Sequence, residues 1–567
     1  MSKLGCVVLS LAACLRLGAE AIDLNGEPHT LDSATELSAE FVNSSDTLAT
    51  LTIDATEALT FSGSISGNIK LVKTGSAQLD VSTVNAFTGG VDLNAGVLNF
   101  TVAGSLSDGT VTIASGATLQ LGAAVKCANP IHLKANGSVV KFSSTANNTS
   151  AGFTGDITGE DVVTTFTPQV AAAGQNYCFY GAITLPKAQL KTSKVNGSFK
   201  FYGDVNVKSA YSVSSGQPMA FQFYGKGNSW EYFELRRYDD NSKYSLFDDG
   251  AIPSESYLYF NAANTAARAS RNVLYVYGNQ KLKYVKADQT TFKCQLDAKS
   301  AGTVTFTDAV NMTPYPIFTG PMSVALNDDS GATWTITTGT STMTGSLTVQ
   351  KGAMSIGGTA TFASVPKIVV AAGAAFSCTS MGTTPLKALK HLDLGTGSSF
   401  TLGDGFEIVL ESYSVNGALA TVPEGWYTGV DNPNPKSGDK QTIAMIKGTG
   451  RIYIPYQGSS SEATWNGGAG DDTSVRTDAN WEGGSAPNLE GGLTATFATG
   501  GSTATFSDAV TLEKIVLNRA TGFTLAAGSD AALVSLASGM EIAAPADGTS
   551  VTNVVAVPMN LSSAQAW

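Results

Sequence analysis

Charged side chains are scarce in this chain of 567 residues: Asp, Glu, Lys and Arg make up 14% of it, against about 25% in ordinary soluble domains. The net charge is −12, and the Lys and Arg residues are scattered. This excludes the basic patch of a nucleic-acid-binding protein. Long apolar runs are also missing after one short stretch at the start, which excludes a protein with several transmembrane helices. A disordered acidic chain is excluded because 43% of the residues are hydrophobic.

Histidine and cysteine are rare, and neither forms a chemical motif. The three histidines do not cluster and form no HExxH, so we interpret them as turn or flanking residues: His29, His132 and His391. No CxxC pair exists, so no zinc or redox site is predicted. We interpret the cysteines beyond the leader as separate core thiols, with a disulfide between distant coils as the alternative: Cys127, Cys178, Cys294 and Cys378.

Signatures of catalysis and cofactor binding are missing as well. The chain has no GxSxG and no GxxxxGK[ST], so neither a hydrolase elbow nor a phosphate-binding loop is predicted. Acidic turns occur at residues 248–250, 327–329 and 471–472, but without the spacing of a calcium loop. We interpret them as solvated turns. No catalytic residue, metal or cofactor is predicted.

The first 21 residues read as an export signal. Lys3 precedes an apolar run from Leu4 to Leu15, which is too short to span a bilayer, and Ala19-Glu20-Ala21 has the pattern of a signal-peptidase site. An alternative is lipidation, because residues 11–14, which end at Cys14, resemble a bacterial lipobox. Both interpretations predict an exported protein.

Short alternating runs dominate the remainder. Leu51-Thr52-Ile53 and Val111-Thr112-Ile113 are typical, and Gly, Asn, Asp and Ser interrupt such runs every few residues. Apolar residues two apart share one face of a strand. The sequence therefore predicts an all-β protein, with one weak helix-like stretch at residues 261–271.

An internal repeat of 22 residues indicates the architecture. Phe-Tyr-Gly recurs at residues 179–181, 201–203 and 223–225, each time preceded by an aromatic and a variable residue, and residues 274–278 are a related copy. Twenty-two residues suit one coil of three short strands and three turns. We expect a right-handed parallel β-helix in which the aromatics stack from coil to coil inside and the glycines turn the chain. A β-propeller needs longer repeats of antiparallel hairpins.

Residues 69–98 resemble a known repeat. Lys73-Thr-Gly75, Phe87-Thr-Gly-Gly90 and Asn94-Ala-Gly96-Val-Leu98 stand at the spacing of the autotransporter-associated β-strand repeat, also called the passenger-associated transport repeat. A weaker copy occupies residues 331–356, and the two cover about a tenth of the chain. The resemblance implies a right-handed β-helix at the surface of a Gram-negative-type bacterium, moved across the outer membrane by translocation machinery, without catalytic residues.

Inward-facing residues follow from the alternation within this repeat. We expect Leu79, Val81, Val91, Leu93 and Leu98 to face the core. The family's C-terminal outer-membrane barrel has no counterpart here. We therefore expect the chain to be a fragment of an autotransporter, with secretion by another route as the alternative.

Changes in composition predict the domain organisation. A signal peptide occupies residues 1–21, and a β-helical passenger-like module occupies residues 22–454, with a Pro- and Asn-rich loop at 429–441. Residues 455–463 read as a linker. Residues 464–567 begin a second, incomplete β-helical module.

One patch concentrates charge and aromatic side chains in this charge-poor chain. β-helical lyases and glycosidases place acids, Arg and aromatic groups on one face, so a ligand contact or an active site is expected here if anywhere. The residues are Trp230, Glu231, Tyr232, Glu234, Arg236, Asp239 and Asp240. The plain alternative is an exposed loop beside the aromatic stack.

The sequence thus predicts a non-enzymatic, exported or cell-surface β-helical protein acting as a stalk, adhesin or envelope component. Its expected partners are surface glycans or ligands on host or neighbouring cells. The alternatives are a polysaccharide-active β-helix enzyme, which should gather two carboxylates within about 10 Å in a groove, and a glycan-binding solenoid.

Overall fold

A computed structural model describes most of the chain beyond the leader. The described residues are 21–31, 36–143, 151–170, 176–191, 197–214, 219–237, 245–261, 273–287, 294–313, 316–379, 384–420, 422–455, 462–487, 489, 493–519, 521–543 and 550–561. For residues 212–214, 219, 220, 236 and 237 only the backbone is described. The predicted signal sequence up to residue 20, and residues 262–271 of the helix-like stretch, lie outside this part of the chain.

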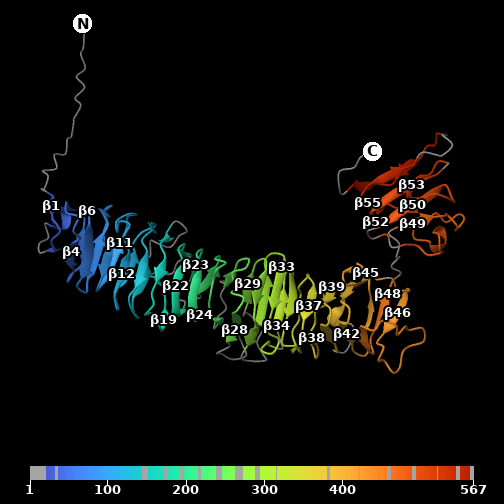
Figure 1. Cartoon of the computed structure of the whole chain (residues 1–567), viewed down its shortest axis with the longest axis horizontal. Coiled ribbons are helices and arrows are strands. Elements are labelled where there is room, and N and C mark those ends of the chain that lie inside the picture. The colour runs from blue at the N-terminus through green and yellow to red at the C-terminus, as the bar shows by residue number, and fades with distance from the viewer. Residues whose placement is uncertain are drawn as a thin grey trace, which may run out of the picture. The chain divides into compact units, whose positions relative to one another are not determined.

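The protein is all-β, with parallel strands stacked as a β-solenoid of about 21 turns of about 22 residues (Figure 1). This confirms the predicted fold class and coil length. The only helical elements in the described ranges are three single-turn 3-10 helices, Glu36–Ser38, Thr384–Leu386 and Asp478–Asn480. Contacts divide the chain into two compact units, Met1–Ser330 with Thr338–Thr344, and Gly331–Thr337 with Gly345–Trp567.

Each coil of the first unit adds a strand to stacked parallel sheets. In a 13-stranded sheet, β4 (Ala49–Asp54), β7 (Ile69–Thr74) and β10 (Val91–Leu93) are consecutive neighbours. In a second sheet, β8 (Gln78–Val81) pairs in parallel with β11 (Val97–Phe100). Parallel neighbours that are not consecutive in the chain are what a coil of successive strands and turns produces.

The alternating pattern correctly identified the core. Leu79, Val81, Val91, Leu93 and Leu98 are each at most 1% exposed. Their side chains point into the coil, and the residues between them point outward, because successive strand residues face opposite sides. Register partners such as Val91 and Leu71 of the preceding coil therefore stack inside.

The Lys-x-Gly motif is a buried clamp between two coils. Lys73, at the end of β7, is fully buried, and its Nζ donates hydrogen bonds to the carbonyl oxygens of Thr74 (2.8 Å), Gly75 (2.7 Å) and Ala95 (3.0 Å). A Cβ on Gly96 would lie 2.7 Å from that Nζ, and Gly96 has a φ of +64°. The Lys-x-Gly and Asn-Ala-Gly elements of the repeat are thus one contact, in which only glycine leaves room for the ammonium group.

The predicted aromatic stack fills the core of the 22-residue repeats. The ring centroids of Phe179 and Phe201 lie 5.3 Å apart, those of Phe201 and Phe223 5.2 Å, and those of Phe223 and Phe247 5.4 Å. All four rings are at most 1% exposed and stack nearly parallel. Equal positions in successive coils meet because the strands pair in register.

The glycines of the Phe-Tyr-Gly repeats are explained by how closely neighbouring coils approach each other. Gly181, Gly203 and Gly225 have no left-handed φ. A Cβ on Gly203 would instead lie 2.4 Å from the carbonyl oxygen of Gly181, and one on Gly225 would lie 2.7 Å from the carbonyl oxygen of Gly203. Gly181 and Gly203 do lie in bends between successive strands, as predicted, but glycine is required there because consecutive coils approach each other closely.

In the second unit, antiparallel strands end the parallel stacking near residue 454. β44 (Ser412–Val415) pairs with β45 (Ala418–Leu419), and β46 (Gly425–Thr428) pairs with β48 (Arg451–Ile454), both antiparallel. Residues 429–441 contain no strand, as predicted for this loop. Covering the edge of a stack in this way protects its unpaired backbone groups.

The strands from β49 (Glu462–Trp465) onward form three further sheets and, among the described residues, pair only with one another. They enclose their own apolar core. In the last coil, Val555 of β57 (Val554–Ala556) is 44% exposed, although its register partner Leu525 is fully buried. Ile542 is 56% exposed in the same way. The domain boundaries at 454 and 464 stay a prediction.

Candidate functional site

The predicted patch does not form a single exposed surface. Trp230 is only 4% exposed, and its ring packs against Phe223 (4.9 Å) and Phe247 (6.4 Å). The expectation that Trp230 contacts a ligand is therefore corrected: its indole fills the core beside the phenylalanine stack. Its sequence neighbours drew attention to it, but a buried indole cannot stack on a sugar in solvent.

Several residues of the patch lie on β26 (Tyr232–Arg237). One of them, Glu234, is buried. Glu234 is 5% exposed, and its Oε1 accepts a hydrogen bond from Nδ2 of Asn261 at 2.7 Å. Glu231 precedes the strand and is exposed. The two carboxylates thus have different environments. Asp239 and Asp240 lie outside the described residues, and only the backbone of Arg236 is described.

Tyrosine rings along this face stack on one another. Tyr232 lies 5.3 Å from Tyr257, and Tyr257 lies 4.5 Å from Tyr284, measured between ring centroids, with interplanar angles of 27° and 13°. Burial, together with Tyr284, Glu231, Tyr232 and Glu234, raises the pKa of Tyr257 to about 12. Because the inner ring faces cover each other, this patch offers a sugar mainly ring edges.

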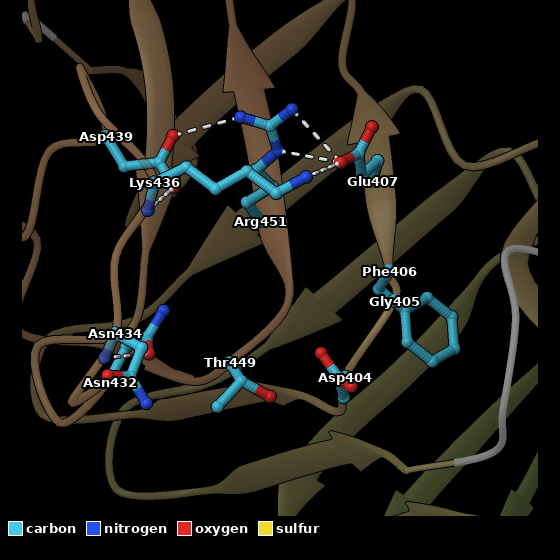
Figure 2. A pocket seen from close by; sticks show the side chains of 10 residues that line it. All are labelled: Asp404, Gly405, Phe406, Glu407, Asn432, Asn434, Lys436, Asp439, Thr449 and Arg451. Atoms are coloured by element: carbon cyan, nitrogen blue, oxygen red, sulfur yellow. Dashed lines mark hydrogen bonds and ion pairs between the residues drawn. The ribbon is translucent and has the colours of Figure 1, made fainter.

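A hollow that sequence reasoning missed lies in the second unit (Figure 2). Its volume is about 440 Å³, within the range of small-molecule sites. It is bordered by β43 (Glu407–Val409), β48 and the loop after β46. The lining residues are Asp404, Gly405, Phe406, Glu407, Asn432, Asn434, Lys436, Asp439, Thr449 and Arg451.

One guanidinium group holds two carboxylates at this hollow, as Figure 2 shows. Arg451 donates from Nη2 to Glu407 Oε1 at 3.0 Å and from Nη1 to Asp439 Oδ1 at 3.1 Å. Lys436 also binds Glu407. The Arg451 guanidinium stacks on the Trp426 ring at 4.2 Å. The residues come from segments up to 44 positions apart, which no local motif could have revealed.

The electrostatics of this network disfavour Glu407 as a catalytic acid. The carboxylates of Glu407 and Asp439 bind one guanidinium group beside the hollow, so they are the pair to compare with the two carboxylates of a glycoside hydrolase. Such an enzyme also needs one carboxyl with a raised pKa to protonate the leaving group. Hydrogen bonds from Lys436 and Arg451 lower the pKa of Glu407. The arrangement instead ties the loop at 429–441 to β48.

A serine and a histidine meet on the outer face of the second unit. His391 Nδ1 lies 2.9 Å from Ser412 Oγ, and His391 Nε2 lies 3.9 Å from Glu411 Oε2. The second distance is too long for a hydrogen bond. The backbone N–H groups of Glu411 and Ser412 both donate to the carbonyl of Lys390, so neither can stabilise an oxyanion. The group is a cross-coil pairing rather than a catalytic triad.

The remaining polar candidates have structural roles. The four cysteines are buried and are not joined by disulfide bonds in this structure, so the disulfide alternative is not formed. Asp249 pairs with Lys226, and Asp472 accepts a hydrogen bond from the Ser474 amide, as expected for solvated turns. The third predicted turn differs, because Asp328 is only 3% exposed and accepts hydrogen bonds from the amide and hydroxyl of Ser330. In the described ranges, no group of three or more His, Cys, Asp or Glu side chains is placed to hold a metal ion. Over those ranges no helix is both long and apolar enough to span a membrane.

Across successive coils, outward side chains pair with residues at or near the same position one coil away. Examples are Lys70 with Asp92, Lys390 with Glu411, and Ser377 with Ser355. These contacts join residues 21 or 22 apart, which is one coil.

Comparison with known proteins gives no further indication of function, because no family model, no curated protein and no solved structure matches this chain.

Proposed function

We propose that this protein is a non-enzymatic, exported β-solenoid of a bacterium that acts as a stalk, adhesin or envelope component. One observation carries the proposal: outward polar and aromatic side chains bind neighbouring side chains of the next coil. Lys70 with Asp92 and the tyrosine stack at Tyr257 are examples. Such pairing stiffens a stack of coils and engages polar groups that would otherwise be available to a substrate.

The role of Lys73 supports the likeness to autotransporter passengers. The residues that define that resemblance are those that clamp one coil to the next, since Lys73 binds the carbonyl of Ala95, beside Gly96. A repeat that folds coil on coil suits a chain that folds progressively as it crosses the outer membrane. Translocation machinery, surface glycans, and ligands on host or neighbouring cells are accordingly the proposed partners.

Export is tested by expressing the full chain in a Gram-negative host and fractionating the cells. We expect the protein outside the cytoplasm. A passenger fragment without its barrel should collect in the periplasm, and a protein secreted by another route should reach the cell surface or the medium, where protease added to intact cells degrades it. N-terminal sequencing should then begin at Ile22, whereas a lipid on Cys14 would support the lipobox. A matched chain lacking residues 1–21 should stay inside. Retention of the full chain in the cytoplasm would overturn the proposal.

The enzyme alternative is favoured only by the two carboxylates at the hollow. It is tested by incubating the protein with a panel of polysaccharides and measuring new reducing ends or unsaturated products. Glu407→Gln and Asp439→Asn are the informative variants, with Glu424→Gln as an exposed control. We expect no activity in any of them. Turnover that is lost only in the first two variants would replace the structural role with an enzymatic one.

The glycan-binding alternative is tested at Tyr232, which stacks on Tyr257 and is half-buried. Retention on immobilised glycans is compared for the wild-type chain and Tyr232→Ala, with Tyr453→Ala as a control outside the patch. Specific retention that Tyr232→Ala abolishes would support glycan binding through this face. Trp230 is unsuitable for this test because its substitution would open the core.

A further inference from the structure

Two ladders of stacked tyrosines lie on the outside of the first unit. In the first, the ring centroids of Tyr180 and Tyr202 are 4.9 Å apart and those of Tyr202 and Tyr224 are 4.8 Å apart, with interplanar angles of 7° and 11°. Each of these residues follows a register-paired phenylalanine by one position, so the ladder continues the order of the inner stack. The second ladder is Tyr232, Tyr257 and Tyr284.

Neighbouring rings in each ladder belong to successive coils. Tyr232 and Tyr257 are direct register partners, and Tyr284 precedes Val285, the partner of Leu258. The strand spacing of about 4.8 Å sets the ring separation. The rings are therefore held face to face by the backbone, and thermal motion of a loop is not needed to bring them together.

We infer that the two ladders are sites of oxidative tyrosine cross-linking, in which phenol rings of adjacent coils become joined by a carbon–carbon bond. The oxidant is a peroxide used by a one-electron oxidising catalyst such as a haem peroxidase. The chemistry needs two tyrosyl radicals in contact, and the ladders supply pairs of rings already in contact. It requires neither export nor a ligand, so it stands apart from the proposed function.

The reaction balances as a two-electron oxidation. Each phenol loses one electron and its O–H proton, and the two radicals join at the ring carbons next to the oxygens. Each of these carbons then loses its proton, and each oxygen regains one. Overall, two electrons and two protons reduce one hydrogen peroxide to two waters.

Solvent exposure and nearby charges determine which tyrosine pairs should cross-link first. Tyr202 is 38% exposed, which lets an oxidant reach the middle of the first ladder. The Nζ of Lys126 sits over the Tyr180 ring at 4.7 Å, and a cation there disfavours loss of an electron from that ring. We therefore expect Tyr202 to join Tyr224 in preference to Tyr180. In the second ladder, Tyr257 and Tyr284 are the closer pair at 4.5 Å.

The ionisation of these phenols fits a step that removes proton and electron together. Burial is the largest cause that raises the pKa of Tyr224 and Tyr257 to about 12. Phenols are protonated at neutral pH even at their ordinary pKa, and the raised pKa extends the protonated state into alkaline solution. Joined coils would resist separation, because a cross-link removes conformational freedom from the unfolded chain.

The full chain is treated at low concentration with a haem peroxidase and hydrogen peroxide, digested, and analysed by mass spectrometry. We expect peptides joined through Tyr202–Tyr224 and Tyr257–Tyr284, each pair lighter by two hydrogens. Their yield should exceed that in the guanidinium-unfolded chain by at least about tenfold when both samples are oxidised with a small-molecule one-electron photo-oxidant, which guanidinium does not inactivate, since fixed geometry favours reaction of adjacent groups.

Phenylalanine variants separate the ladders while keeping the ring stacks. Tyr202→Phe should abolish cross-links in the first ladder only, and Tyr257→Phe those in the second only. The ladder left intact reports that each variant is folded. Tyr453→Phe, at a half-buried tyrosine whose hydroxyl binds Glu424, should change neither. Cross-links spread equally over other tyrosines, only between chains, or equally abundant in the unfolded chain would overturn the inference.

Discussion

Replacing Lys73 by Met should loosen one coil of the solenoid without removing its apolar stem. The side chain of Lys73 is fully buried, and its Nζ donates to three carbonyl oxygens that belong to two successive coils. Methionine fills a similar volume but donates no hydrogen bond. The substitution therefore tests the clamp and leaves the packing of the strand largely unchanged.

The expected loss of stability is the contribution of the three hydrogen bonds minus the cost of burying the charged ammonium group. A hydrogen bond to a charged group contributes about 1.5–3 kcal/mol. Burial lowers the pKa of Lys73, so keeping the ammonium group buried has a cost that methionine avoids. Thr74, Gly75 and Ala95 are half-buried, so water can reach part of the freed carbonyl groups. We expect a net loss of about 3 kcal/mol, near the lower end of what breaking a buried charged pair costs.

Native-state hydrogen exchange measures this loss where it occurs. A stack of coils need not unfold as one unit, so a single global transition would dilute a local change. The amide of Asn94 donates to the carbonyl of Lys73, and the amide of Ala77 donates to that of Ala55. Both amides should exchange about a hundredfold faster in Lys73→Met, since each 1.4 kcal/mol corresponds to a factor of ten.

Lys70→Met is the matched control on the same strand. Lys70 points outward and pairs with Asp92 at 3.2 Å, and both side chains are about one-third exposed. Such surface pairs contribute about 0–1 kcal/mol. Equal exchange rates in the two variants, or no change at Asn94 in Lys73→Met, would refute the clamp.

Three further substitutions test the close coil contacts, the ladders and the loop. Gly203→Ala should destabilise its coil, because the new Cβ would lie 2.4 Å from the Gly181 carbonyl oxygen, whereas Gly357→Ala, with its nearest atom at 3.6 Å, should be tolerated in thermal unfolding. The folded Tyr224 keeps its proton up to a pKa of about 12, while the unfolded phenol ionises near 10; stability should therefore fall as pH rises between these values, and less steeply in Tyr224→Phe. Arg451→Met should free the loop at 429–441, and limited proteolysis there should become faster while the cleavage pattern elsewhere stays the same.

Strands and coil length were predictable because their signals are local or repeated. Val91 and Leu93 both face the core because residues two apart on a strand lie on the same side. This alternation does not depend on which other strands pack nearby. The 22-residue recurrence of Phe-Tyr-Gly is enough to predict that Phe201 stacks on Phe179, and their rings do stack. In a repetitive chain, the strand positions predicted for one coil apply to the other coils as well.

The candidate site was predicted less well, because exposure and partners depend on contacts distant in sequence. The acids and aromatic residues next to Trp230 in the sequence suggest a sugar-stacking side chain, yet its ring lies in the core beside Phe223. Arg451 carries no motif, and its importance comes from Glu407, 44 residues earlier, and from a loop that folds back on β48. Local composition contains no information on which of these segments meet.

The order of residues along the chain is thus sufficient to specify the β-solenoid, its coil length and its inward-facing rows. Three features emerge only when the coils are stacked: the motif lysine clamps two coils, the tyrosines form ladders, and one guanidinium group binds the two carboxylates of the hollow. Periodicity is a property of single strands, whereas each of these contacts exists only once coils pair in a particular register.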